Sequence, residues 1–227
     1  MLNWSQVSQE ILSLFLHPNC PLCGRSAEQV ICKNCERQLQ QCRLSQAQFK
    51  GKGGISVFAW GNYGGLLKRA IAQLKYEKQP QLARPLGSYL AQTWLTMNAA
   101  TVSRQPIVVP IPLHRKKQTQ RGYNQAELIA RSFCEITGLR LQAQGLKRVK
   151  NTEALFGLNP KEREKAVMEA FQVGKGLKAQ QRVILIDDIY TTGTTVQTAQ
   201  NTLQQGGMKV IAVGAIAASQ AESRAKF

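Results

Sequence analysis

The chain has 227 residues, enough for one domain of ordinary size and a small additional segment. Its hydrophobic content of 43% allows a substantial core and argues against wholesale disorder. The formal net charge is +17, from 30 Lys and Arg against 13 Asp and Glu, which favours polyanionic partners such as nucleic acid, a membrane surface or phosphorylated ligands. A basic surface with no such partner is the alternative, because net charge reports association and not fold.

The first apolar stretch of the chain, VSQEILSLFL at residues 7–16, has helical spacing. It is short and interrupted by Gln9 and Glu10, so it is not expected to span a bilayer. The first basic residue is Arg25, so the positive start of a secretory signal is missing. No later segment approaches the roughly twenty apolar residues of a membrane span. These features predict a soluble, cytoplasmic protein with no membrane insertion.

Five of the six cysteines lie within residues 20–42, and the sixth is Cys134. Residues 20–35 read CPLCGRSAEQVICKNC, which is two C-x2-C pairs separated by eight residues. In a chain without a signal peptide, clustered thiols more often bind metal than form disulfides. Two such knuckles close a tetrahedral site of four thiolates, the ligand set that suits Zn2+. A redox pair or a metal-free remnant is the alternative.

Because all four positions hold cysteine, none is left for a catalytic water, and the predicted zinc is structural. Its expected ligands are Cys20, Cys23, Cys32 and Cys35. The two other thiols, Cys42 and Cys134, are expected to be packing residues rather than ligands.

Residues 49–54, FKGKGG, form a loop rich in glycine and lysine. It predicts a boundary between an N-terminal segment with the short helix and the knuckles, residues 1–50, and a larger domain, residues 51–227. In the larger domain the apolar patterns predict, in chain order, a strand at 55–60, helices at 66–76 and 82–97, a strand at 107–111, a helix at 126–136, a strand at 183–187, a helix at 194–205 and a strand at 210–217. Aliphatic strands separated by helices are typical of an α/β fold with a parallel sheet covered on both faces.

Residues 110–125, PIPLHRKKQTQRGYNQ, lie between a predicted strand and a predicted helix. They contain four cations, Arg115, Lys116, Lys117 and Arg121. The longer stretch 61–121 has ten Lys and Arg but a single acidic residue. A basic loop beside a binding site can clamp an anionic group and shield it from water. A solvated basic loop or a nucleic-acid contact is the alternative.

The stretch VILIDDIYTTGTT, residues 183–195, predicts the binding site. In parallel sheets ligands bind beyond the carboxyl ends of the strands, which places Asp187, Asp188 and the following loop at the site. Glycine lets backbone N–H groups approach a ligand, the start of a helix adds a positive dipole, and hydroxyls add hydrogen bonds. The loop that combines them suits a phosphate monoester and consists of Thr191, Thr192, Gly193, Thr194 and Thr195.

This loop contains no lysine, and the chain has no G-x-x-x-x-G-K-[ST] motif, so a Walker P-loop is excluded. The paired carboxylates suit a ligand with hydroxyl donors, or a hard cation such as Mg2+. A sugar phosphate with free hydroxyls, bound together with Mg2+, satisfies all of these groups. The alternative is that Asp187 and Asp188 only cap the next helix, which is natural for one aspartate and not for a pair followed by TTGTT.

Residues 183–195 resemble, along all 13 positions, the phosphoribosyl-pyrophosphate (PRPP) signature of type I phosphoribosyltransferases. The resemblance implies that Asp187 and Asp188 contact the ribose 2′- and 3′-hydroxyls at the catalytic centre and that residues 191–195 hold the 5-phosphate. These enzymes displace pyrophosphate from C1 of the ribose with a nitrogen base, and Mg2+ is bound to the pyrophosphate. In such enzymes the loop after the first helix also helps to bind pyrophosphate, which implicates Lys75 and Tyr76.

The order of the motifs is similar to that of the ComF family, from about residue 10 to residue 218. The four-cysteine pair is followed by YGGLLKRAIAQLKY, then by VVPIPLHRKKQTQRGYNQAELIA, then by the PRPP signature. Members of this family are phosphoribosyltransferase-like proteins associated with natural competence, the uptake of DNA for transformation. Where relatives often have Gln and Asn, this chain has Leu155 and Ala166, which weakens a role of residues 151–171 in ligand binding.

Three functions stay open on the sequence. The first is a competence protein that binds PRPP or a related ribose phosphate and contacts incoming single-stranded DNA, with other competence proteins as further partners. The second is an active phosphoribosyltransferase that acts on an unidentified base, although no aromatic pair with hydrogen-bonding partners indicates a base-recognition hood. The third is a zinc-containing nucleic-acid-binding module with a vestigial PRPP site, against which the intact Asp187-Asp188-TTGTT pattern argues.

Overall fold

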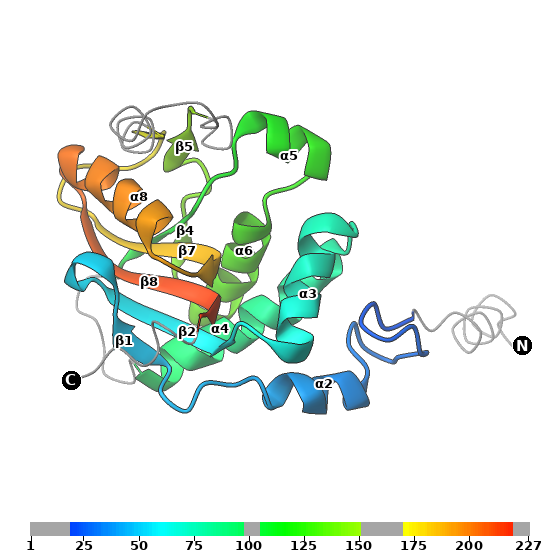
Figure 1. The fold of residues 1–227 in the computed structure, drawn as a ribbon. Coiled ribbons are helices and arrows are strands. Elements are labelled where there is room, and N and C mark those ends of the chain that lie inside the picture. Colours follow the sequence, from blue (N-terminus) through cyan, green and yellow to red (C-terminus); the bar gives the residue numbers. More distant parts are fainter. Residues whose placement is uncertain (1–18, 98–104, 151–169, 220–227) are drawn as a thin grey trace, which may run out of the picture.

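The computed structural model describes residues 19–97, 105–150 and 170–219 (Figure 1). Their main feature is a six-stranded sheet in the order β1-β2-β8-β7-β3-β4. Its neighbouring strands run parallel except for β1, which pairs antiparallel with β2 at one edge. In chain order these strands are β1 (Gln48–Lys50), β2 (Ser56–Asn62), β3 (Ile107–Pro110), β4 (Arg140–Leu141), β7 (Arg182–Tyr190) and β8 (Lys209–Ala218).

Helices and a small second sheet complete the described part of the chain. The second sheet pairs β5 (Leu146–Arg148) with β6 (Phe171–Val173). The helices are α2 (Lys33–Gln40), α3 (Gly65–Tyr76), α4 (Ala83–Met97), α5 (Arg115–Arg121), α6 (Gln125–Thr137) and α8 (Thr194–Gln205), with 3-10 turns η1 (Lys52–Gly54) and η2 (Pro80–Leu82). Within the described ranges, none of the helices has both the length and the apolar character needed to cross a membrane.

The main sheet is buried on both faces. Along β7, Ile184 and Ile186 belong to the core under α3, α4 and α6, whereas Val183 and Leu185 belong to the core under α8. Successive side chains of a strand point to opposite faces, so a strand covered on both sides requires a continuous aliphatic run. Figure 1 shows the arrowheads of β2, β7 and β8 pointing the same way, toward the side where α3 lies.

The predicted α/β architecture is confirmed, since every predicted strand and helix of the larger domain is present. The largest difference is at β7, which was expected to end at Asp187. It continues to Tyr190 because Ile189 and Tyr190 pair with Ala217 and Ala218 of β8. The acidic pair therefore lies within the last part of this strand rather than beyond it.

The basic segment, expected as a loop, forms helix α5. Its sequence RKKQTQR has no apolar face, so it shows no helical periodicity. The ends of the helix are defined by local capping instead. The Nδ1 atom of His114 accepts from the N–H of Lys116 at 3.4 Å, and Gly122 ends the helix with a φ of +87°.

The predicted boundary loop at residues 49–54 connects β1 and β2, which pair in the main sheet. Residues 48–50 therefore join the sheet, and the division at residue 50 stays a prediction. The helix expected at residues 7–16 lies outside the described residues, as do Leu155 and Ala166.

Candidate functional site

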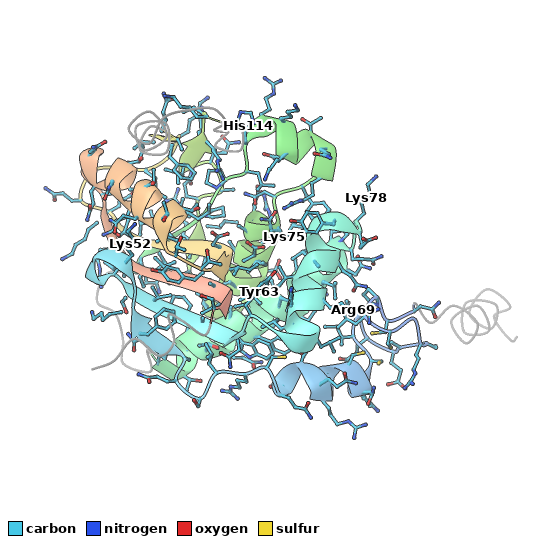
Figure 2. The ribbon with its side chains drawn as sticks, in the orientation of Figure 1. Lys52, Tyr63, Arg69, Lys75, Lys78 and His114 are labelled. Carbon is cyan, nitrogen blue, oxygen red and sulfur yellow. The ribbon has the colours of Figure 1, made fainter. Side chains whose placement is uncertain are left out.

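The acidic pair lies near the edge where the carboxyl ends of the parallel strands meet. Asp188 is buried, with 4% of its surface exposed, and Asp187 is half-buried. The backbone N–H of Asp188 donates to Oδ1 of Asp187 at 2.8 Å. Near the end of α3, Lys75 places its Nζ atom 2.5 Å from Oδ2 of Asp188 (Figure 2). The structure thus brings together two predicted parts of the site that are distant in the sequence.

The environment of Asp187 favours its neutral form. Its pKa lies well above the ordinary value of 3.8, chiefly because burial disfavours the charged carboxylate. The negative charge of the adjacent Asp188 raises this pKa further, while the N–H of Asp188 and the ammonium of Lys75 oppose the shift. A ligand hydroxyl or a divalent cation beside Asp187 would favour the charged form. The acidic pair therefore suits a ligand that brings such groups with it.

The threonine loop after β7 faces solvent and leads into α8. Its exposed members are Thr191, Thr192, Thr194 and Thr195. The hydroxyl oxygens of Thr192 and Thr194 lie 3.1 Å apart. Gly193 caps α8 with a φ of +71°, a left-handed conformation that favours glycine. The first amide groups of α8 have no acceptor within the helix and carry the positive end of its dipole, an arrangement suited to phosphate.

A cavity of about 360 Å³ opens beside Lys75, between the end of α3 and helix α5. It is lined by Lys75, Tyr76, Lys78, Lys117, Gln120 and Arg121. Four of these residues carry a positive charge and none is acidic, so the cavity attracts an anion with several charged oxygens. The guanidinium of Arg121 lies 5.5 Å from the centre of the Tyr76 ring, a contact that holds α5 against α3.

The structure divides the four cations predicted in the basic segment. Lys117 and Arg121 line the cavity, whereas Arg115 and Lys116 are exposed on the first turn of α5 and do not line it. The reason is helical geometry, because Lys117 shares a face of α5 with the residues three and four positions after it. Gln120 joins the lining through the same spacing.

Lys78 was not predicted at the site. It follows the end of α3 and adopts a left-handed φ of +50°, which is uncommon for a residue with a side chain. The local signal for a role at the site was its position in the short basic sequence LKYEK. That Lys78 lines the cavity depends on where α3 ends relative to α5, which the local sequence does not indicate.

The motif RGYNQ fixes α5 and α6 relative to α3. After Gly122 ends α5, the hydroxyl of Tyr123 donates to the carbonyl of Leu74 in α3 at 2.6 Å. The side chain of Asn124 caps α6 and also donates to the carbonyl of Ile111 at 3.1 Å. These contacts hold the cationic face of α5 over the end of α3.

The four-cysteine cluster has the geometry of a tetrahedral metal site. The sulfur atoms of Cys20, Cys23, Cys32 and Cys35 all lie within 4.8 Å of one another. The sulfur atoms of Cys23 and Cys32 are 3.6 Å apart, and a tetrahedron with Zn–S bonds of about 2.3 Å has S–S edges of about 3.8 Å. The pKa of Cys32 is lowered to about 7, chiefly by a hydrogen bond from the backbone of Cys35. The donor set therefore fits Zn2+.

The cysteine segment is joined to the main core. The hydroxyl of Tyr89 in α4 donates to Oε1 of Glu36 in α2 at 2.9 Å. The Tyr89 ring stacks on Trp60 of β2 with 4.5 Å between ring centres, and both rings belong to the core. The remaining thiols, Cys42 and Cys134, pack against the same core and lie outside the cluster.

Several known proteins are similar to this chain over most of its length. Competence protein F of Haemophilus influenzae is 31% identical over 163 residues, which are 69% of this chain and 70% of that protein. Competence protein ComFC of Bacillus subtilis is 27% identical over 193 residues, 83% of this chain and 72% of that protein. The DNA utilization protein YhgH of Salmonella typhimurium is 27% identical over 200 residues, 84% of this chain and 86% of that protein. No protein-family model matches the chain.

Solved phosphoribosyltransferases are more distant. An adenine phosphoribosyltransferase aligns with a TM-score of 0.44 and 15% identity over 81% of this chain and 91% of that one. The adenine phosphoribosyltransferase of Leishmania donovani aligns with a TM-score of 0.40 and 14% identity over 65% of this chain and 56% of that one. The predicted architecture, a parallel sheet flanked by helices and preceded by a four-cysteine segment, is confirmed by the strand order and the cysteine cluster.

Replacement of Cys20 by serine should remove bound zinc from the purified protein, because one of four thiolates is lost. We expect about one zinc per chain in the wild type and a large loss in Cys20→Ser. The matched control is Cys42→Ser, a thiol outside the cluster, which should keep the metal. Elemental analysis measures the content, and equal zinc in Cys20→Ser and the wild type would contradict the four-ligand site.

Substitutions at the two aspartates should have opposite effects on the stability of the ligand-free protein. Because the pKa of Asp187 is raised, its contribution to folding stability is full below about pH 4 and is lost as the pH rises through the raised pKa. Asp187→Asn should therefore raise the melting temperature by a few degrees at neutral pH, with a gain that shrinks on acidification. Asp188→Asn leaves Lys75 without its partner and should lower stability by about 1–3 kcal/mol. Thermal unfolding across pH checks both, and a destabilised Asp187→Asn would refute this account.

Proposed function

Because this chain belongs to the ComF family of competence proteins, we propose that it binds PRPP, or a related ribose phosphate, with Mg2+ as part of DNA uptake. The observation that carries the proposal is the position of Lys75, which contacts Asp188 and also lines the basic cavity. One side chain therefore connects a site for hydroxyls with a site for a polyanion. PRPP carries these two groups on adjacent carbons of its ribose.

Each part of PRPP has a counterpart in this assignment. The 5-phosphate lies on the threonine loop, residues 191–195, and the ribose hydroxyls lie on Asp187 and Asp188. The pyrophosphate enters the cavity between α3 and α5, where Lys75 exchanges its contact with Asp188 for one with phosphate oxygens. Bound Mg2+ neutralises charge on the pyrophosphate, and the acidic pair would hold it.

The exposed face of α3 supports contact with single-stranded DNA. Lys68 and Arg69 are exposed on this helix, and two exposed aromatic rings lie at its ends, Tyr63 at 36% exposure and Tyr76 at 72%. The ammonium of Lys68 lies 5.9 Å from the Tyr63 ring centre. Figure 2 labels Arg69 on α3 and Tyr63 just before the start of this helix. Cations for the phosphates and aromatic rings for the bases are the combination that binds single strands.

We further assign a structural Zn2+ to the four-cysteine cluster and a cytoplasmic location to the protein. The sulfur geometry supports zinc because its S–S spacing matches a tetrahedral site. The location is supported by the thiols themselves, since six free cysteines are typical of a reducing compartment. Other competence proteins are the expected partners, on the strength of the family.

PRPP with Mg2+ should raise the melting temperature of the wild type by several degrees, because a ligand at 100 times its Kd adds about 2.7 kcal/mol of stability. The double variant Asp187→Asn, Asp188→Asn should show no shift, since both carboxylates that meet the ribose are lost. The matched control for charge is the double variant Glu28→Gln, Glu135→Gln, which neutralises two exposed carboxylates outside the cavity and should keep the full shift. Absence of any shift in the wild type would end the PRPP assignment.

A fluorescent single-stranded oligonucleotide should bind with an affinity that falls steeply with salt. The double variant Lys68→Gln, Arg69→Gln should bind more weakly and reduce the salt slope by about 1.4, or about 0.7 for each lost phosphate contact. Tyr63→Ala should weaken binding through lost stacking and leave the slope unchanged. Lys209→Gln is the control, because Lys209 is exposed at the start of β8, at the opposite end of the sheet. Binding that is absent, or flat with salt, would exclude the DNA contact.

A further inference from the structure

We propose that Lys52, from the turn between β1 and β2, supplies the cation that holds the 5-phosphate on the threonine loop. The inference rests on the proposed binding of a ribose phosphate and names a residue for it that no local motif indicates. A Walker-type loop carries its own lysine, whereas residues 191–195 carry none. In this chain the lysine comes from a distant segment.

The turn that carries Lys52 is packed directly on the threonine loop. A Cβ atom added at Gly193 would lie 3.1 Å from Cβ of Lys52, so the lysine side chain begins at the capping residue of α8. A Cβ added at Gly53 would collide with the side chain of Gln197, one turn into the same helix. Figure 2 places Lys52 beside α8. A lysine stem of four carbons, anchored there, reaches an anion on the loop.

Tyr190 fixes this arrangement. The backbone N–H of Lys52 donates to the hydroxyl oxygen of Tyr190 at 2.9 Å, and the Tyr190 ring packs edge-on against Phe49 with 5.7 Å between ring centres. The ring is buried, and added Cβ atoms at both Gly51 and Gly193 would collide with it. Two glycines therefore let the turn and the threonine loop approach the same phenol from two sides. The contact with Tyr190 uses the backbone of Lys52, so the side-chain ammonium stays available to bind a ligand.

The local charges require such a cation. A phosphate monoester carries up to two negative charges, and the acidic pair of β7 lies a few residues before the loop that would hold it. The first turn of α8 contributes only the partial charge of its dipole and has no basic side chain. Lys52 is exposed, and within the described ranges it forms no ion pair. Its charge is therefore available to offset that of the ligand.

The experiment compares the binding of two fragments of PRPP. Calorimetric titration with ribose 5-phosphate and with pyrophosphate plus Mg2+ reports the two ends of the site separately. Lys52→Gln should lower the affinity for ribose 5-phosphate by about tenfold, the usual effect of one lost charged contact. Its affinity for pyrophosphate should stay within about twofold of the wild type. Arg121→Gln, in the basic cavity, should show the reverse pattern. Lys52→Arg keeps the charge and should retain most of the binding of ribose 5-phosphate.

The matched control is Lys50→Gln, an equal change of charge at an exposed residue of the same hairpin. If Lys50→Gln lowers the affinity for ribose 5-phosphate as much as Lys52→Gln does, the cause is the net charge of the hairpin and not a contact made by Lys52. That result overturns the inference. Unchanged binding in Lys52→Gln, beside a wild type that binds, overturns the role of Lys52 alone. A wild type that binds neither ribose 5-phosphate nor PRPP overturns the proposed function as well. The melting temperature of Lys52→Gln should equal that of the wild type, because the hydrogen bond to Tyr190 uses the backbone.

Discussion

The contact between Lys75 and Asp188 is the interaction on which the candidate site depends. Both side chains are largely shielded from solvent, at 17% and 6% exposure, so each needs the charge of the other. Removing one partner from this shielded pair costs about 1–3 kcal/mol, which ties the end of α3 to the carboxyl end of β7. Lys75 also lines the basic cavity, so this contact lies where the acidic pair and the cavity meet.

Apart from the Lys75–Asp188 contact, the site keeps like charges close together, and this lowers the folding stability of the ligand-free protein. Two carboxylates are adjacent in a poorly solvated strand, and four cations line a cavity with no acidic residue. Like charges held together raise the energy of the folded protein, unless an outside group neutralises them. A ligand that carries both hydroxyl and phosphate groups would relieve both effects at once. The same clustered charges that lower the folding stability therefore favour binding of such a ligand.

The cysteine segment packs against the same core that supports α3. Its cluster shares a core with α4 through Glu36 and Tyr89, and Tyr89 stacks on Trp60 of the strand that leads into α3. A metal held by four thiolates would stabilise the N-terminal cysteine segment, whose described part has few apolar residues of its own. The four-cysteine cluster and the carboxylate site are thus separate in chemistry but connected through one core.

The sequence by itself determined the strands, the α/β class, the cysteine cluster and the position of the acidic pair before the threonine loop. Each of these depends on local pattern, because strands buried on both faces need unbroken aliphatic runs and a metal site needs spaced thiols. Tertiary structure alone decided that β7 extends through the aspartates by pairing with β8. It also decided that α5 turns Lys117 inward and Lys116 outward, and that Lys52 lies on the threonine loop. These features depend on contacts between residues far apart in the chain, for which no periodicity or motif exists.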